Sequence, residues 1–162
     1  MKEESASDGF KKVSRAGLVE LLNQDLSREY QAIIAYVVYS QTLKGPEFMN
    51  IAGELEKHAA EELGHAIIIA KQIDYLGGIP TVEAKTVRMS EKAREMLRFD
   101  LENETETIRH YRERIRQCEA LDEFAMSERI REILIDEQDH QIALATALGE
   151  SVQAPQHTKQ GK

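Results

Sequence analysis

The sequence predicts an all-α protein: an antiparallel bundle of four helices with a long connection between the second and the third. Three observations support this fold class. The only prolines are Pro46, Pro80 and Pro155, so long uninterrupted helices are allowed between them. Four segments carry apolar residues at alternating steps of three and four, the period of a helix with one buried face. A pattern of acidic residues also recurs along the chain, which indicates two similar helical hairpins.

The first two helices have clear ends. The first is expected over residues 15–44 and stops at Gly45. Pro46 suits the first position of the second helix, where the N–H that proline lacks would have no partner. The second helix ends at Gly77-Gly78-Ile79-Pro80, because glycine adopts the C-cap conformation and proline cannot continue the helix. The connection that follows runs through Val87.

The third and fourth helices are expected to begin at capping residues. Ser90 is expected to cap the third helix, since a serine hydroxyl accepts a hydrogen bond from a free N–H of the first turn. The fourth helix is expected to begin at Asp122, where Leu121 and Met126 have the spacing of a hydrophobic staple. It is expected to end at Gly149.

The composition describes one domain with a surplus of negative charge. The bundle is expected to span residues 15–149, and the polar segments 1–14 and 150–162 are expected to be disordered tails. The net charge of -8 argues against general affinity for nucleic acids and suits a protein that attracts cations. The single cysteine, Cys118, excludes a disulfide framework and a Cys-rich metal site, and a reducing cytoplasmic compartment fits it. No signal peptide or membrane-spanning stretch is visible.

The repeat places acidic residues and histidines inside the predicted bundle. The segment 25–29, Asp-Leu-x-x-Glu, recurs at 100–104, and each copy precedes an acid-Glu-x-x-His block, at 61–65 and 136–140. Helical periodicity puts a glutamate in the buried stripe of every helix, and a histidine one turn further in two of them. The six candidate ligands are Glu29, Glu62, His65, Glu104, Glu137 and His140.

These six residues predict a site for two metal ions. Burying four carboxylates together without counterions would cost more free energy than a domain gains by folding. Four carboxylates and two neutral imidazoles carry four negative charges, which two divalent cations would cancel. Oxygen-rich ligation with one imidazole per ion suits iron or manganese. Two single glutamates with two Glu-x-x-His blocks are also the ligand set of di-iron and di-manganese carboxylate bundles.

Several neighbours are expected to support the ligands. Histidine ligands usually donate their second N–H to a carboxylate, and the acidic residues within one turn of the candidates are Asp25, Glu61, Asp100 and Asp136. Tyr36 lies two turns after Glu29 on the same face, where its hydroxyl can bond a ligand carboxylate or donate an electron, or simply be satisfied in the core. Tyr111 is interpreted as a core residue, and His58 as a partly buried polar contact rather than a third histidine ligand.

On these residues the chain resembles the ferritin-like superfamily, most closely the bacterioferritins and their Dps-like relatives. The resemblance covers residues 18–148 and rests on the segments 22–36, 62–65, 97–104 and 133–140. It implies ferroxidase activity, in which Fe(II) is oxidised by dioxygen or peroxide and kept as ferric mineral inside a hollow shell. Each subunit would bind two iron ions, which manganese or zinc can replace. By resemblance, one ion is held by Glu29 and His65 and the other by Glu104 and His140, with Glu62 and Glu137 bridging.

The chain departs from the pattern of these relatives in three places. Leu63 stands where bacterioferritins carry the methionine that binds haem, so no haem is expected. Residues 150–162 cannot supply the fifth helix of the 24-subunit cages, which favours a dodecameric shell over a 24-mer. The metal site lies within one bundle, whereas DNA-protecting mini-ferritins place theirs between subunits. The acidic residues Glu3, Glu4 and Asp8 also argue against DNA binding by the N-terminal segment.

Two apolar runs predict association between copies of the chain. Residues 32–39 and 66–70 are apolar on nearly every side, although a bundle helix needs only one apolar stripe. The first and second helices are therefore expected to pair with a second copy as a symmetric dimer, and no membrane partner is expected.

Two other functions fit parts of the sequence. A two-metal peroxidase or oxidase of the rubrerythrin or manganese-catalase type would use the same ligands without storing iron, although the Cys-x-x-Cys motifs of a rubredoxin domain are absent. A metal-free helical scaffold would leave the four buried carboxylates unexplained. Iron oxidation with mineral storage is therefore the leading hypothesis.

Overall fold

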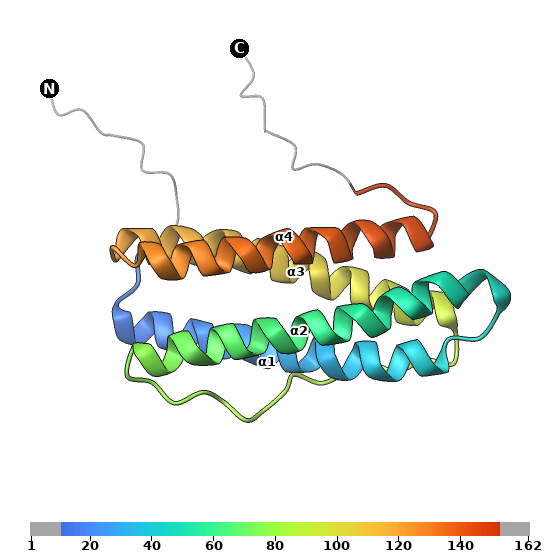
Figure 1. Ribbon diagram of the computed structural model, residues 1–162, viewed down its shortest axis with the longest axis horizontal. Coiled ribbons are helices and arrows are strands. Elements are labelled where there is room, and N and C mark those ends of the chain that lie inside the picture. Colours follow the sequence, from blue (N-terminus) through green and yellow to red (C-terminus); the bar gives the residue numbers. More distant parts are fainter. Residues whose placement is uncertain (1–10, 153–162) are drawn as a thin grey trace, which may run out of the picture.

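The computed structural model describes residues 11–152, which form four long helices and one short 3-10 helix. The elements are α1 (Arg15–Thr42), η1 (Pro46–Phe48), α2 (Met49–Tyr75), α3 (Ala93–Ala120) and α4 (Phe124–Ala147). α1 and α2 form one antiparallel hairpin, and α3 and α4 form the other (Figure 1). The predicted all-α four-helix bundle is thereby confirmed. Most of the two predicted tails, residues 1–10 and 153–162, lies outside the described residues.

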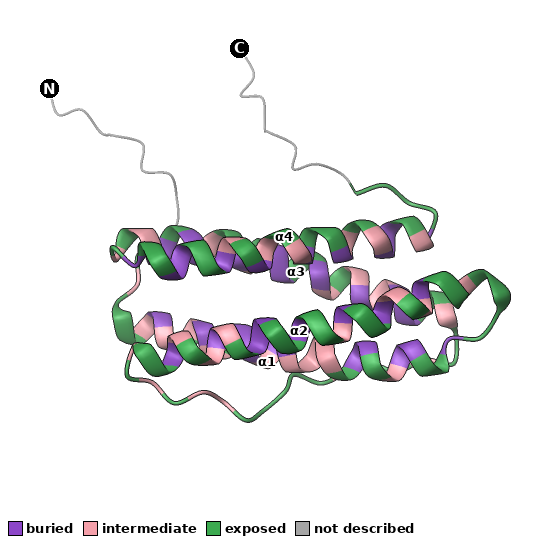
Figure 2. Cartoon of the chain, in the orientation of Figure 1, coloured by how far each residue is buried: buried purple, intermediate pink, exposed green. Residues whose placement is uncertain are grey.

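The apolar core consists of two clusters with a polar layer between them. One cluster, around Leu22, Ile73 and Met126, fills the end of the bundle where α1 and α4 begin. The other, around Leu55 and Leu97, fills the opposite end. Figure 2 shows the buried residues along the inward-facing sides of the helices. Buried carboxylates from all four helices lie in the layer between the clusters, which makes this layer the candidate functional site.

Three predicted helix starts differ from the structure by a few residues. Pro46 begins the 3-10 helix η1, and α2 itself begins at Met49. Ser90 does not cap α3, because its hydroxyl accepts the N–H of Lys92 and donates to the carboxylate of Glu95. Asp122 lies outside α4, because its φ of 59° is a left-handed conformation, whereas an N-cap residue is extended. All three helices therefore begin later than predicted.

The connection between α2 and α3, residues 76–92, runs back along α1 (Figure 1). Near its start Gly77, with a φ of 82°, closes α2 where the sequence predicted its end. Polar side chains on successive turns of α1 hold the connection: Asn23 donates to the carbonyl of Ile79, Ser27 to that of Glu83 and Gln31 to that of Thr86. These bonds fix the path that brings the start of α3 beside the end of α1.

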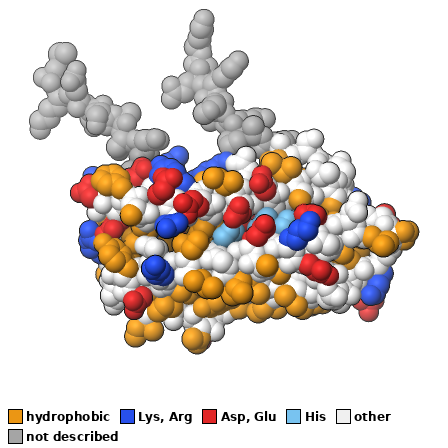
Figure 3. Space-filling model, in the orientation of Figure 1, with side chains coloured by type: hydrophobic (Ala, Val, Ile, Leu, Met, Phe, Trp, Pro, Cys, Tyr) orange, Lys and Arg blue, Asp and Glu red, His pale blue; other side chains and the backbone are white. Residues whose placement is uncertain are grey.

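Apolar side chains are exposed along the first hairpin and its connection. Ile34 and Val37 of α1 and Leu63 and Ile67 of α2 are between 44% and 61% exposed. Figure 3 shows hydrophobic side chains gathered along the lower edge of the molecule, where this hairpin and the connection lie. The bundle therefore has a second apolar face besides its core. Within residues 11–152, no helix is both long and apolar enough to cross a membrane.

Candidate metal centre

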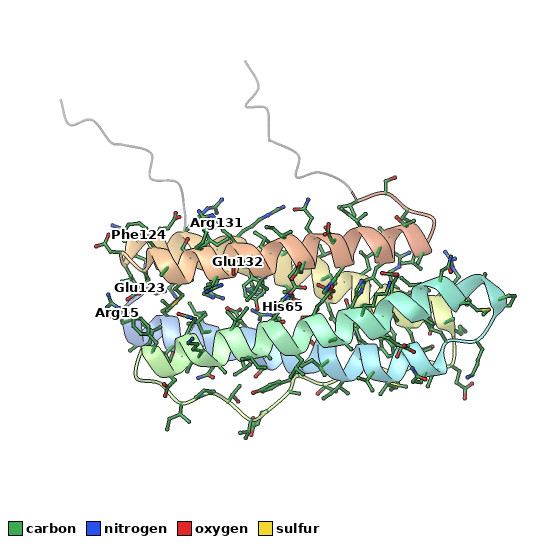
Figure 4. The ribbon with its side chains drawn as sticks, viewed as in Figure 1. Arg15, His65, Glu123, Phe124, Arg131 and Glu132 are labelled. Carbon is green, nitrogen blue, oxygen red and sulfur yellow. The ribbon has the colours of Figure 1, made fainter. Side chains whose placement is uncertain are left out.

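Six polar side chains meet in the layer between the two apolar clusters. They come from all four helices, and each is at most 3% exposed. Figure 4 shows one of them, His65, between the two hairpins. The spacing of three in each Glu-x-x-His block places both side chains on one face of the helix, and the partner helix of each hairpin adds one glutamate. The six are the predicted candidates Glu29, Glu62, His65, Glu104, Glu137 and His140.

The six residues form two overlapping groups of four, in which one ligand atom per residue lies within 4.8 Å of the others. Glu62 and Glu137 belong to both groups, which are completed by Glu29 with His65 and by Glu104 with His140. His65 Nδ1 lies 3.1 Å from Glu62 Oε2 and 3.3 Å from Glu137 Oε1. His140 Nδ1 lies 3.0 Å from Glu62 Oε1 and 3.4 Å from Glu137 Oε2. Each shared carboxylate therefore presents one oxygen to each histidine.

The donor atoms fit two metal ions. Several buried atoms of the centre have no hydrogen-bond partner within residues 11–152, although buried polar atoms normally have one. These atoms are Glu29 Oε2, Glu62 Oε1, Glu104 Oε2, both carboxylate oxygens of Glu137, and His140 Nδ1. The spacings between histidine nitrogens and carboxylate oxygens run from 3.0 to 3.9 Å, and the shortest equal the separation of about 3.0 Å between neighbouring ligands of an octahedral ion bound at about 2.1 Å. Oxygen-rich ligation with one imidazole per ion suits iron or manganese.

Without cations, protons must neutralise the carboxylates. Burial raises the pKa of Glu62 to about 8, and the negative charge of Glu29 adds to the rise. Burial, together with the charge of a neighbouring glutamate, also raises the pKa of Glu104 and the pKa of Glu137. Burial opposes charge on Glu29 as well, but its hydrogen bonds outweigh burial and lower its pKa. Burial disfavours the charged form of His140, yet the close carboxylates of Glu137 and Glu62 raise its pKa to about 12. Cations would take the place of these protons.

Two half-exposed carboxylates orient the histidines. His65 Nε2 lies 2.9 Å from Asp136 Oδ2, and His140 Nε2 lies 2.7 Å from Glu61 Oε2. Because each carboxylate accepts the proton on Nε2, Nδ1 is the ring nitrogen that faces the ligand carboxylates, and it can bind a cation once its proton is released. The expected support of histidines by neighbouring acids is confirmed for Asp136 and Glu61.

The same expectation is wrong for Asp25 and Asp100. Asp25 accepts hydrogen bonds from Arg114, with Nε at 2.7 Å from Oδ2, and also pairs with Arg28. This buried network links α1 to α3 beside the centre without touching a histidine. Asp100 is buried, and its Oδ2 has no partner among the described residues. Burial and the nearby charge of Glu104 raise the pKa of Asp100 well above its usual value.

Two tyrosines hold the single glutamates of the centre. The hydroxyl of Tyr36 donates to Glu104, and the hydroxyl of Tyr111 donates to Glu29. Burial and the nearby carboxylates raise the pKa of both phenols well above the usual value, so both keep their protons. The sequence singled out Tyr36 but interpreted Tyr111 as a core residue. The repeat could have predicted the role of Tyr111. It relates Tyr36 to Tyr111 by the same offset that relates Glu29 to Glu104.

The ring of His58 packs against the ring of His140. The two rings stack with their centroids 4.0 Å apart and their planes 26° apart. Burial lowers the pKa of His58 to about 4, and the nearby charge of His140 contributes to the shift. His58 is more deeply buried than the sequence indicated, since it is only 5% exposed.

Comparisons with known proteins agree with this architecture. The family model of the ferritin-like domain matches residues 19–152. The chain is 29% identical to a bacterioferritin of Rhodobacter capsulatus, covering 83% of this chain and 88% of that protein. It is 27% identical to a bacterioferritin of Mycobacterium leprae, covering 86% and 92%. A crystal structure of a ferritin-like, diiron-carboxylate protein from Bacillus anthracis is similar with a TM-score of 0.80 and 34% identity, covering 83% of this chain and 96% of that one.

Proposed function

The chain belongs to the ferritin-like domain family, and from this membership and the geometry of the centre we propose that it is a ferroxidase that stores iron. It oxidises Fe(II) with dioxygen or peroxide at the six-residue centre and keeps the ferric product as mineral inside an oligomeric shell. The observation that carries the proposal is the placement of Glu62 and Glu137, whose two oxygens face the two histidines separately.

The two Fe(II) ions are the substrates. Glu29 and His65 hold one ion, Glu104 and His140 hold the other, and the shared carboxylates keep the pair close together. With two ions bound side by side, one oxidant molecule can take an electron from each ion. Dioxygen with two electrons and two protons gives hydrogen peroxide, and peroxide with two more of each gives water. Both reactions transfer two electrons, so neither produces a radical from the oxidant.

The surrounding residues hold the ligands in place. Asp136 and Glu61 fix the histidine rings, and the two tyrosines fix the single glutamates. The ligand atoms are therefore already arranged for cations before the ions arrive. Apolar clusters on both sides of the polar layer keep bulk water away from it.

The assembly and the compartment are also proposals. The exposed apolar side chains of α1 and α2 support a symmetric dimer through these helices, and a dodecameric shell would close around the mineral. A cytoplasmic location fits the single cysteine, Cys118, which is a buried free thiol. Leu63 lacks the sulfur that would bind haem, so no haem is included in the proposal.

The site assignment is tested by replacing one ligand and one neighbour on the same helix. Glu104→Ala removes a buried carboxylate, and we expect the initial rate of Fe(II) oxidation to fall by at least about a hundredfold. Glu106→Ala removes an exposed carboxylate two residues away and should keep the wild-type rate. The rates are measured in a stopped-flow spectrophotometer on metal-free protein mixed with Fe(II) in air.

The thermal midpoint of the metal-free Glu104→Ala variant should equal or exceed the wild-type value, because one of four repelling carboxylates is gone. Wild-type oxidation kinetics in Glu104→Ala would remove the site assignment.

A further inference from the structure

The two halves of the centre have the same kinds of ligand but different charged neighbours. One turn before each single glutamate lies a buried aspartate, Asp25 before Glu29 and Asp100 before Glu104. The internal repeat relates the two aspartates by the same offset that relates the two glutamates. Residues one turn apart lie on the same face of a helix, so each aspartate belongs to the surroundings of one half of the centre.

The half that contains Glu29 has a surplus of positive charge beside it. Asp25 pairs with Arg114, whose Nε lies 2.7 Å from Oδ2, and also with Arg28. The side chains of both arginines are at most 6% exposed, so solvent screens their charges only weakly. Two guanidinium groups with one carboxylate leave this buried network with one net positive charge.

The half that contains Asp100 lacks both arginines. The repeat places the neutral Asn103 where the other half has Arg28. It places Tyr39 where the other half has Arg114, and the hydroxyl of Tyr39 donates to a backbone carbonyl of the connection. Oδ2 of the aspartate is buried and has no hydrogen-bond partner among residues 11–152. The repeat therefore keeps the carboxylate in this half and replaces both of its cationic partners.

The other charged groups near the centre do not offset this difference. Glu61 faces one histidine ligand and Asp136 faces the other, so each half has one such carboxylate. Burial lowers the pKa of His58 to about 4, so its ring is neutral where it stacks on the second histidine. Arg88, near Asp100, is 45% exposed and pairs with an exposed glutamate at 2.8 Å, which offsets its charge.

We propose that these neighbours make the two metal positions unequal, so that the position at Glu104 and His140 fills first and binds its ion more tightly. A net positive charge beside the other position repels a divalent cation, whereas a carboxylate beside the first position attracts it. The order does not depend on whether Asp100 holds a proton. Even a neutral side chain there contrasts with the net positive charge of the buried network beside the other half.

The difference gives the two ions different roles, a consequence that rests on the proposed function. The ion at Glu104 and His140 stays bound longer. The ion at Glu29 and His65 exchanges more readily, so it is the one that moves on to the mineral after oxidation. Protons do not cancel the effect, because a divalent ion carries two charges where a displaced proton carries one, and more negative surroundings favour the ion.

Zinc occupancy tests the order directly. Crystals of the metal-free assembled protein are soaked at a series of buffered Zn(II) concentrations, because Zn(II) takes the same ligands without redox chemistry. Anomalous diffraction at the zinc edge gives the occupancy of each position separately. In the wild type we expect the position at Glu104 and His140 to be half filled at a Zn(II) concentration at least about tenfold lower than the other position.

Two variants test the cause from opposite sides. Asp100→Asn replaces the carboxylate with an amide of the same shape and should raise the Zn(II) concentration that half fills the first position. Arg28→Asn introduces the neutral residue of the repeat, leaves Arg114 paired with Asp25, and should lower the concentration that half fills the second position. Each variant should therefore reduce the difference. Glu95→Gln changes an exposed carboxylate at the start of α3 and should leave both concentrations unchanged.

Equal occupancies in the wild type at every concentration, or the reverse order, would overturn the inference and leave the ferroxidase assignment standing. An order that persists undiminished in both variants would also overturn it, because the charged neighbours would then not be its cause. The absence of zinc from both positions would remove the centre itself, and with it the proposed function. Asp100→Asn gives a result even where Arg28→Asn does not fold, since Asp100 Oδ2 has no partner to lose among residues 11–152.

Discussion

Tyr36 and Tyr111 do the same work on opposite sides of the metal centre. Each is buried, and each donates its hydroxyl proton to the single glutamate on a helix of the other hairpin. A carboxylate that keeps this donor stays in one orientation, while a carboxylate that loses it has an unsatisfied buried oxygen. Both tyrosines are therefore expected to support metal binding equally, although the sequence predicted a role in the centre for Tyr36 alone.

Tyr111→Phe tests that equivalence. We expect Tyr111→Phe and Tyr36→Phe each to lower the rate of Fe(II) oxidation by about tenfold, because a hydrogen bond of about 1–1.5 kcal/mol to a ligand is lost. Tyr30→Phe serves as the control, since Tyr30 is only partly buried and is not among the residues of the centre. A wild-type rate in Tyr111→Phe, together with a slow Tyr36→Phe, would show that Tyr111 is a core residue only.

The residues of the centre could be predicted where regular helix geometry fixes which side chains lie on the same face. The spacing of three puts Glu62 with His65 on one face, and the repeat extends this to Glu137 with His140. The structure places these candidates together, and their role as metal ligands stays a prediction. The deep burial of His58 was underestimated, because stacking on His140 depends on how α2 faces α4 and not on either helix alone.

At the scale of helices, a buried ion pair joins the two hairpins. Arg114 of α3 donates to both carboxylate oxygens of Asp25 of α1, and the side chains are almost completely inaccessible to solvent. The sequence suggested Asp25 as support for a histidine, because it lies one turn from the candidate ligand Glu29. Its actual partner could not be predicted, since the pairing depends on which helices of the two hairpins face each other.

Arg114→Leu should destabilise the protein strongly. Removing Arg114 leaves the buried carboxylate of Asp25 with Arg28 as its remaining ionic partner, and loss of one partner of a buried pair costs up to about 3–5 kcal/mol. Arg129→Leu is the matched control, because Arg129 forms an exposed pair with Glu132 whose loss costs at most about 1 kcal/mol. Thermal unfolding of the metal-free variants provides the comparison. Equal midpoints for the two variants would contradict a stabilising role of the buried pair.

Helix boundaries show where local sequence is a weaker guide. The end of α2 was predicted correctly, because glycine with a positive φ followed by a proline leaves few alternatives. The starts of α3 and α4 were not, because Ser90 and Asp122 have other backbone conformations open to them. The path of the connection also escaped prediction, since it depends on side chains of α1, a distant part of the chain.

At the scale of the whole molecule, the apolar face of α1 and α2 is the expected contact between two copies. Val37→Asp places a charge in this face and should shift the smallest assembly from a dimer toward the 18.4 kDa chain. Ile135→Asp changes an exposed apolar residue of α4 and should leave the dimer intact. Light scattering coupled to size-exclusion chromatography gives the masses. A wild-type protein that is monomeric at micromolar concentration would contradict the proposed interface.

Counting the iron that each chain binds distinguishes iron storage from a simple two-metal enzyme. Fe(II) is added stepwise in air to metal-free protein, and the soluble iron bound per chain is measured after each step. The six ligands can hold two ions. For a protein that stores iron we expect uptake to continue far beyond two per chain, with the excess held as mineral. Saturation at the few ions that the described ligands can hold would contradict storage and would indicate a two-metal peroxidase or oxidase instead.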